Sequence, residues 1–311
     1  MRFLRFLLSG CIMNSSFFAE GIMILDAFAK INWSLDITGV REDGYHLMDM
    51  IMQPVSLSDE ITLSAASSLS ISTGGWPPSR ADETNLAYRA ALRLREVTGY
   101  TGGAHIHVHK QIPIGAGMGG GSTDAAAVLI GLNRLWNTGL SSSDLEKTGL
   151  SLGADVPFFI RGGLTRTRGI GENLENHDCL YNYWLVVIQP CPGLSTAQVF
   201  SLWHQNIPLR RPDTDKALHG LETGDLSMLC GHLGNVLQPV SESLRPEISA
   251  ACEALSVQHA VFSGMTGSGS AVFGVFRSSS EAKQAFQKLS REYKTIFLCH
   301  TQHDSVRIMQ E

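Results

Sequence analysis

The chain has 311 residues, of which 43% are hydrophobic and 17% are charged, and this length and composition suit a folded protein with two domains. A net charge of −5 and a sequence pI of about 6.1, without a basic block or a basic amphipathic helix, argue against a general role in binding nucleic acid or a membrane surface. The six cysteines have no paired spacing, which suits free thiols in a reducing compartment better than disulfides or a zinc site.

Residues 1–22 differ from the rest of the chain. The run MRFLRFLLSG, with two arginines and a short apolar core, has the outline of a secretory leader, while Met13 or Met23 is an alternative translation start. No uninterrupted apolar run approaches the roughly 20 residues that a membrane span needs. We therefore interpret residues 1–22 as an N-terminal extension, either a leader or the product of a mistaken start.

From Ala27 onward, alternating apolar residues predict two strands joined by the turn-rich segment Gly39–Gly44. Lys30 lies in the apolar start of the first strand. A lysine there either extends to a surface or faces an anion, and the pattern alone does not decide between them. Tyr45 and His46 follow the turn, where the pattern favours ordinary half-exposed residues.

The run ADETNLAYRAALRLREVTG, residues 81–99, predicts an amphipathic helix with Leu86, Ala90 and Leu94 on one face. Thr84 or Asn85 at its start is typical of an N-cap.

The strand AHIHVHK, residues 104–110, follows and places His105, His107 and His109 on one face. We do not expect a metal there, because successive side chains on one face are about 7 Å apart. No acidic or cysteine ligand lies in the same stretch.

The segment Ile112–Ala127, IPIGAGMGGGSTDAAA, has five glycines within seven residues and then enters a helix-forming sequence. Glycines let backbone N–H groups approach a bulky anion, and the N-terminus of a helix adds partial positive charge. Ser122, Thr123 and Asp124 are expected to supply capping oxygens for this helix. The segment therefore predicts a polyphosphate site.

Other glycine-rich loops fit this segment less well. A Walker A loop needs a lysine where Gly120 is followed by Gly121 and Ser122. The spacing of Gly115, Gly117 and Gly120 matches the dinucleotide fingerprint, but the second strand with its acidic end is missing. A protein-kinase loop would be followed by a strand with a catalytic lysine, and none follows. A surface loop without function would gain nothing from three consecutive glycines.

A second helix is expected at residues 143–150, followed by SLGADVPFFIRGG, in which Asp155 lies between a helix end and an apolar segment. A carboxylate surrounded by apolar residues destabilises the fold unless it is ion-paired or has a function. A carboxylate that merely ends a helix before Pro157 is the alternative. RTRGIGENLENH then predicts a strand pair.

The character of the chain changes near Cys179, where WLVVIQP predicts a buried strand. Residues 205–225 are polar and are expected to form a mobile connection. Residues 264–276, GMTGSGSAVFGVF, predict a tight glycine turn that leads into an alternating strand.

Residues 113–126 resemble the central phosphate loop of the GHMP small-molecule kinases, with Met118 where leucine is more usual. GADVPFF around Asp155 and the turn in residues 264–276 resemble two further motifs of that family, and the resemblance covers about residues 23–305. AKIN and the TG-R-DGYH segment resemble the members that phosphorylate a cytidine diphosphate derivative of methylerythritol for non-mevalonate isoprenoid synthesis. A mevalonate or homoserine type of GHMP kinase is the alternative.

The resemblance implies a mixed α/β (α+β) fold with two domains. Residues 23–178 would form an N-terminal ATP-binding domain like ribosomal protein S5 domain 2, and residues 179–311 a ferredoxin-like α+β domain. It also implies a cytoplasmic kinase that uses ATP and Mg²⁺, as a monomer or homodimer, on a small-molecule substrate without nucleic-acid or membrane partners.

The resemblance also implies roles for individual residues. Lys30 and Asp155 would be catalytic, with Asp155 as the general base that Lys30 keeps ionised. The implied ATP-binding residues are Asn85, Leu86, Lys110, Pro113, Gly115, Gly117, Gly119, Gly120, Gly121, Ser122 and Thr123, with Lys110 as the cation that the loop lacks and Ser122 as a magnesium ligand. The implied substrate-binding residues are Asn32, Tyr45, His46, Asp155, Gly267 and Ser268.

In this interpretation the Tyr45 ring stacks on the cytosine and the His46 imidazole reads its hydrogen-bonding edge. The segment LGNVLQPV keeps only Asn235 of the polar residues usual in the family, so the helix there is expected to be structural.

Overall fold

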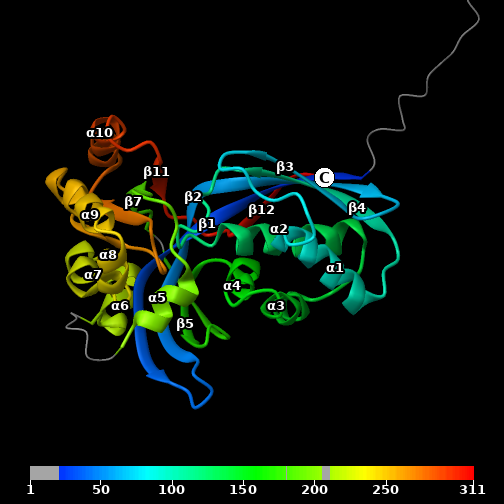
Figure 1. Cartoon of the computed structure of the whole chain (residues 1–311), viewed down its shortest axis with the longest axis horizontal. Coiled ribbons are helices and arrows are strands. Elements are labelled where there is room, and N and C mark those ends of the chain that lie inside the picture. The colour runs from blue at the N-terminus through cyan, green and yellow to red at the C-terminus, as the bar shows by residue number, and fades with distance from the viewer. Residues whose placement is uncertain (1–20, 180, 205–210) are drawn as a thin grey trace, which may run out of the picture.

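The computed structural model describes residues 21–179, 181–204 and 211–311, in which the strands form two sheets (Figure 1). The strands are β1 (Ile22–Val40), β2 (His46–Ala66), β3 (Ser70–Gly75), β4 (Gly103–Lys110), β5 (Leu164–Gly169), β6 (Asn173–His177), β7 (Trp184–Ile188), β8 (Gly234–Asn235), β9 (Phe262–Met265), β10 (Val272–Phe276), β11 (Ile296–His300) and β12 (Val306–Gln310). The helices are α1 (Leu86–Thr98), α2 (Gly120–Leu135), α3 (Ser142–Leu150), α4 (Val156–Arg161), α5 (Thr196–Leu202), α6 (Thr214–Thr223), α7 (Leu226–His232), α8 (Gln238–Leu244), α9 (Glu247–Val257) and α10 (Ser279–Leu289). Most of the interpreted leader, residues 1–20, lies outside the described residues.

The first sheet is organised around the long antiparallel hairpin of β1 and β2, with the strand order β12-β1-β2-β4-β3. Helix α2 packs on β1 and β2, and α1 and α4 pack against α2 on the same side of the sheet (Figure 1). Gly131 of α2 lies so close to the sheet that an added Cβ would be 2.4 Å from a Leu63 methyl carbon. Leu25 and Leu63 from the sheet and Leu132 from the helix are fully buried, as their periodic spacing in the sequence requires.

The second sheet is antiparallel throughout, with the order β11-β7-β10-β9, and α9 and α10 pack on it. The four strands of this sheet and the two helices packed on it follow one another as β7, α9, β9, β10, α10, β11, with α5, α6, α7, β8 and α8 inserted between β7 and α9; without that insertion the order is the β-α-β-β-α-β pattern of ferredoxin-like folds. The expected α/β (α+β) fold class is therefore confirmed.

The chain links the two sheets again near the C-terminus, because it leaves the second sheet after β11 and forms β12, which pairs with β1 of the first sheet. Residues 306–310 thus belong to the first sheet, although the second domain was expected to run to residue 311. The boundary at residue 178 stays a prediction. No helix of the described residues is long and apolar enough to cross a membrane.

Two local predictions are wrong. Helix α2 begins after Gly119 without any side-chain cap, because Thr123 and Asp124 are buried instead of turning back to the helix end. The stretch 205–225 contains α6, whose first turn is capped by the Asp213 side chain through the N–H of Lys216, so this part is no mobile connection. Residues 205–210 of the stretch lie outside the described residues.

Candidate active site

A cavity of about 520 Å³ lies where the glycine loop meets β1, β2, the start of α4, α5 and the turn before β10. The following predicted site residues line it: Lys30, Asn32, Asn85, Leu86, Lys110, Pro113, Gly115, Gly117, Gly119, Gly120, Gly121, Ser122, Asp155, Gly267 and Ser268. Thr123, Tyr45 and His46 do not. The structure therefore brings together in one cavity most of the residues expected to bind ATP and substrate.

The two glycine motifs touch each other through their backbones. A Cβ on Gly117 would be 2.2 Å from the carbonyl oxygen of Thr266, and one on Gly267 would be 2.7 Å from the carbonyl oxygen of Gly117. Larger residues at either place would force the two loops apart. The side-chain amide of Asn235 donates to the carbonyls of Met265 and Gly267, at 3.0 and 2.8 Å, so Asn235 holds the turn in place.

The glycine loop ends in backbone N–H groups that have no acceptor within α2. The first helical bond of α2 runs from the N–H of Thr123 to the carbonyl of Gly119, at 2.9 Å. The N–H groups of Gly120, Gly121 and Ser122 therefore have no acceptor within the helix. Because these N–H groups lie at the N-terminus of a 16-residue helix, they favour an anion such as a phosphate group.

Lys30 and Asp155 meet beside this loop. The backbone N–H of Lys30 donates to the carbonyl of Met118 at 3.0 Å, which ties β1 to the loop. The Lys30 ammonium donates to the side-chain oxygen of Asn32 at 2.5 Å and lies 3.9 Å from Oδ2 of Asp155. Burial lowers the pKa of Lys30, and the Asp155 carboxylate opposes this effect.

Asp155 occupies the residue before α4, but its side chain makes no capping bond to the helix. The carboxylate is about one third exposed, whereas the side chain of Lys30 is 4% exposed. A carboxylate that faces a cavity beside a buried cation can accept a proton from a bound hydroxyl group. If Asp155 served only to cap a helix end, its side chain would accept a hydrogen bond from a backbone N–H group of α4. It makes no such bond.

Lys110 lies in a buried charge cluster beneath the loop. Its ammonium donates to Asp124 at 2.8 Å and also to Asp59. Asp59 in turn accepts from the backbone N–H groups of Gln111 and Ile112, at 2.6 and 2.8 Å, and so fixes the start of the glycine loop. The charge of Lys110 is thus already neutralised within this cluster, and its expected role as a cation for ATP stays a prediction.

The carboxyl groups of Asp59 and Asp124 share the single ammonium group of Lys110, so one of the two has no counter-charge of its own. Burial raises the pKa of Asp124 to about 8, although Lys110 opposes the shift and Asp59 reinforces it. The Asp124 oxygen Oδ1 and the Thr123 hydroxyl are buried without a hydrogen-bond partner among the described residues. The Thr123 side chain is therefore buried inside the protein and does not line the cavity.

The residues expected to hold cytosine lie at the tip of the β1–β2 hairpin. Tyr45 is 60% exposed in the turn and lies outside the cavity lining. The His46 ring packs at 5.2 Å from the ring of Phe200 and at 5.6 Å from that of Trp203, between ring centroids. Because Phe200 lines the cavity, His46 lies directly behind one wall of it. The binding roles of Tyr45 and His46 stay predictions.

Sequence reasoning missed three residues that shape the cavity. Phe200 lines the cavity and contacts His46, Thr196 lines it and shares a 2.9 Å hydrogen bond with Ser268, and the Thr266 hydroxyl accepts from the backbone N–H of Asn32 at 2.9 Å. Local sequence patterns did not indicate these contacts, because the hydrogen-bonding partners lie 72 and 234 residues apart in the chain.

The histidines of β4 have hydroxyl partners on β3. His105 shares hydrogen bonds with Ser70 and Ser72, at 2.9 and 2.8 Å, and His107 with Ser72 at 2.8 Å. Among the described residues, no group of three or more histidine, cysteine, aspartate or glutamate side chains is placed to hold a metal ion.

Two family models match the chain. The model of the GHMP kinases N terminal domain matches residues 85–163, which include the glycine loop and Asp155. The model of the GHMP kinases C terminal domain matches residues 217–295, which include the turn that contacts the loop.

Similar proteins cover nearly the whole chain. A protein of Alkaliphilus metalliredigens named 4-diphosphocytidyl-2-C-methyl-D-erythritol kinase is 42% identical over 88% of this chain and 94% of its own length. A protein of Moorella thermoacetica with the same name is 39% identical over 90% of this chain and 99% of its own length.

Solved structures agree in fold. A crystal structure of 4-(cytidine 5'-diphospho)-2C-methyl-D-erythritol kinase has a TM-score of 0.78 and 31% identity, over 90% of this chain and 99% of that one. Homoserine kinase from Cytophaga hutchinsonii has a TM-score of 0.74 at 17% identity, over 93% of this chain and 98% of that one, which is a likeness of fold alone.

Proposed function

Because this chain belongs to the GHMP kinase family, we propose that it transfers the γ-phosphoryl group of ATP to the 2-hydroxyl of 4-diphosphocytidyl-2-C-methyl-D-erythritol. The observation that carries the proposal is the Lys30–Asp155 pair beside the glycine loop in one cavity. The names of relatives at 42 and 39% identity support this substrate over mevalonate or homoserine.

The glycine loop would bind the donor. The free N–H groups of Gly120, Gly121 and Ser122 and the dipole of α2 suit the β- and γ-phosphates of ATP. Asn85 and Leu86 line the same cavity and suit the adenine end. Asn85 also caps α1 by accepting from the N–H of Ala87 at 3.0 Å, so its side chain has a structural role as well.

Asp155 would act on the acceptor. Its carboxylate takes the proton of the 2-hydroxyl while the hydroxyl oxygen bonds to the γ-phosphorus and the bond to the ADP oxygen breaks. Lys30 steadies the negative charge that spreads over the transferred group, and it favours the ionised form of Asp155. Most of the remaining catalysis is positioning.

The loop also offers an oxygen ligand that suits Mg²⁺, because Ser122 lines the cavity and carries a hydroxyl group. Ser122 would contact the ion, which when bound neutralises phosphate charge. A cytoplasmic location and a monomeric or homodimeric state stay predictions.

The test is phosphate transfer from ATP measured with purified protein and four acceptors. We expect turnover with 4-diphosphocytidyl-2-C-methyl-D-erythritol and none with mevalonate, homoserine or galactose. Turnover with mevalonate or homoserine and none with the cytidine compound would refute the proposed substrate and leave the kinase chemistry intact.

A further inference from the structure

The half of the β1–β2 hairpin that carries Tyr45 and His46 is supported by few other strands. Strand β12 pairs with β1 only at residues 24–27, and β4 pairs with β2 only at residues 60–66. Toward the tip, β8 pairs with Ser34 and Leu35 of β1, β5 pairs with Met48–Met52 of β2, and the turn extends past the other strands of the sheet (Figure 1). Beyond these short pairings, the position of the tip depends on side chains.

Two acidic residues stand opposite each other in this half of the hairpin. Asp36 of β1 and Asp49 of β2 are direct partners in the antiparallel register, so their side chains leave the same face. Both are largely buried, with side chains 13% and 17% exposed. Like charges directly opposite each other destabilise a strand pair unless cations neutralise them.

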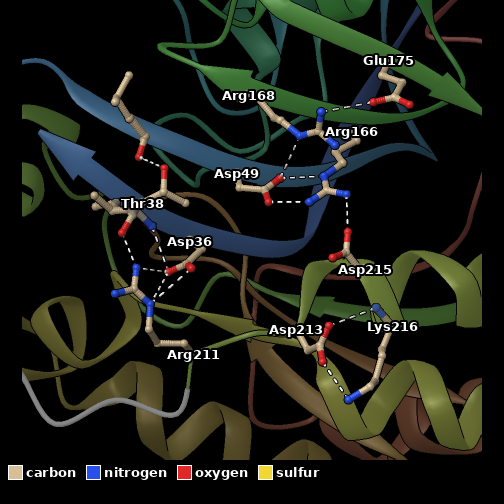
Figure 2. A network of polar contacts seen from close by, with 12 residues as sticks. Asp36, Thr38, Asp49, Arg166, Arg168, Glu175, Arg211, Asp213, Asp215 and Lys216 are labelled. Atoms are coloured by element: carbon tan, nitrogen blue, oxygen red, sulfur yellow. Dashed lines mark hydrogen bonds and ion pairs between the residues drawn. The ribbon is translucent and has the colours of Figure 1, made fainter. Parts of the chain in front are cut away.

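Two arginines supply these cations (Figure 2). Arg166 of β5 holds Asp49 through two parallel hydrogen bonds, Nε to Oδ1 at 2.8 Å and Nη2 to Oδ2 at 2.7 Å. Arg211 holds Asp36 through Nε and Nη2, at 3.0 and 2.7 Å from Oδ1, and also donates to the carbonyl of Ile37. Bidentate pairs of this kind fix orientation as well as distance.

Both arginines connect the hairpin to α6. Arg166 donates to Asp215 in the first turn of α6 at 2.6 Å, and Arg211 lies just before that helix. Helix α6 is in turn tied to the second sheet, because the Tyr183 hydroxyl donates to the carbonyls of Gly220 and Leu221, each at 3.4 Å. The ion pairs thus join the hairpin to α6 and, through Tyr183, to the residue before β7 of the second sheet.

We propose that Arg166 and Arg211 are positioning residues that hold the β1–β2 tip against the second domain and so form the base-binding end of the substrate site. The proposal rests on the proposed function, in which His46 and Tyr45 bind cytosine. Neither arginine lines the cavity, so both act through the hairpin and not on the reacting atoms. The observation that carries the proposal is the facing pair of Asp36 and Asp49, each neutralised by an arginine. Two facing carboxylates destabilise a strand pair, and the hairpin alone does not require them.

The test variant is Arg211→Gln, because Arg211 is half-exposed and its loss threatens the fold less than loss of Arg166. If the tip occupies its binding position only part of the time, KM for the cytidine substrate rises by the inverse of that fraction, here about five- to tenfold. KM for ATP and kcat should stay near wild type. The matched control is Arg134→Gln, which removes an exposed ion pair with Glu311 at the opposite end of β1 from the hairpin tip and should change neither KM.

A double-variant cycle tests whether the pair acts as a unit. Asp36→Asn should also raise KM for the cytidine substrate, and Arg211→Gln combined with Asp36→Asn should raise it by less than the product of the single effects. Amide hydrogen exchange should become faster at residues 36–48 in Arg211→Gln and stay unchanged in α2.

If amide hydrogen exchange at residues 36–48 is as slow in Arg211→Gln as in the wild type, the inference is wrong, whichever substrate the protein uses. A fall in kcat together with equal rises in KM for ATP and for the cytidine substrate would also overturn the inference, because this pattern would indicate a general structural role. Failure of the wild-type protein to phosphorylate the cytidine compound would instead refute the proposed function, and the exchange measurement would still test the attachment of the hairpin.

Discussion

Replacing Gly119 by alanine should damage the fold, because this residue combines an unusual backbone with a crowded site. Its φ is +75°, in the left-handed region that favours glycine. A Cβ built there would be 2.5 Å from the ring of Phe159 and 3.3 Å from Cγ of Lys30. The added methyl group would therefore point into the protein, and not toward the bound anion.

The expected loss has two parts. The left-handed conformation costs a residue with a Cβ about 1–2 kcal/mol. Overpacking against a buried ring adds about 1–3 kcal/mol. A total of about 2–5 kcal/mol corresponds to a fall in Tm of roughly 3–8 °C for a protein of this size.

Thermal unfolding of Gly119→Ala and Gly121→Ala measures this effect with a matched control. Gly121 has no atom within 4 Å of its built Cβ and lies in the first turn of α2, where alanine is the better helix former. Gly121→Ala should keep or raise Tm. If Gly119→Ala has the Tm of the wild type, the packing argument is wrong.

Two further predictions concern the buried cluster and the hairpin tip. Lys110→Met should cost about 3–5 kcal/mol in denaturant unfolding, because it leaves the Asp59 carboxylate buried without a cation; a loss no larger than the about 0–1 kcal/mol of an exposed ion pair would contradict this. Burial raises the pKa of Asp124 in the folded chain above its value of 3.8 in the unfolded chain, so this carboxyl group lowers stability as pH rises from the unfolded pKa toward the folded pKa. Asp124→Asn should therefore flatten the dependence of Tm on pH, and an unchanged slope would refute the assignment. His46→Ala should raise KM for the cytidine substrate with little change in KM for ATP, and the reverse pattern would remove His46 from the substrate site.

The features predicted from the sequence were those whose signal is local. The glycine loop, its helix and the strand pair of the hairpin follow from runs of adjacent residues, and Lys30 and Asp155 stood out as charged groups in apolar company. The start of α2 was predicted with the wrong capping residues, because burial of Asp124 depends on Lys110, 14 residues earlier.

Features that join distant segments were not predicted. Asp59 and Lys110 are 51 residues apart, Asp49 and Arg166 are 117 apart, and Asp36 and Arg211 are 175 apart. A single sequence contains no signal for such pairs, because each residue alone is typical of an exposed strand or loop. Phe200 was missed for the same reason.

The most direct test of the account is the kcat of Asp155→Asn with 4-diphosphocytidyl-2-C-methyl-D-erythritol and ATP. Asparagine keeps the shape of the side chain but cannot accept the proton, so kcat should fall by about 10²- to 10⁴-fold, with Tm and the binding of both substrates near wild type. Lys30→Met should also lower kcat, and the double variant should lose less than the product of the single losses. A near-normal kcat in Asp155→Asn would contradict the role of Asp155 as the base, and an unfolded variant would favour a structural carboxylate at the start of α4.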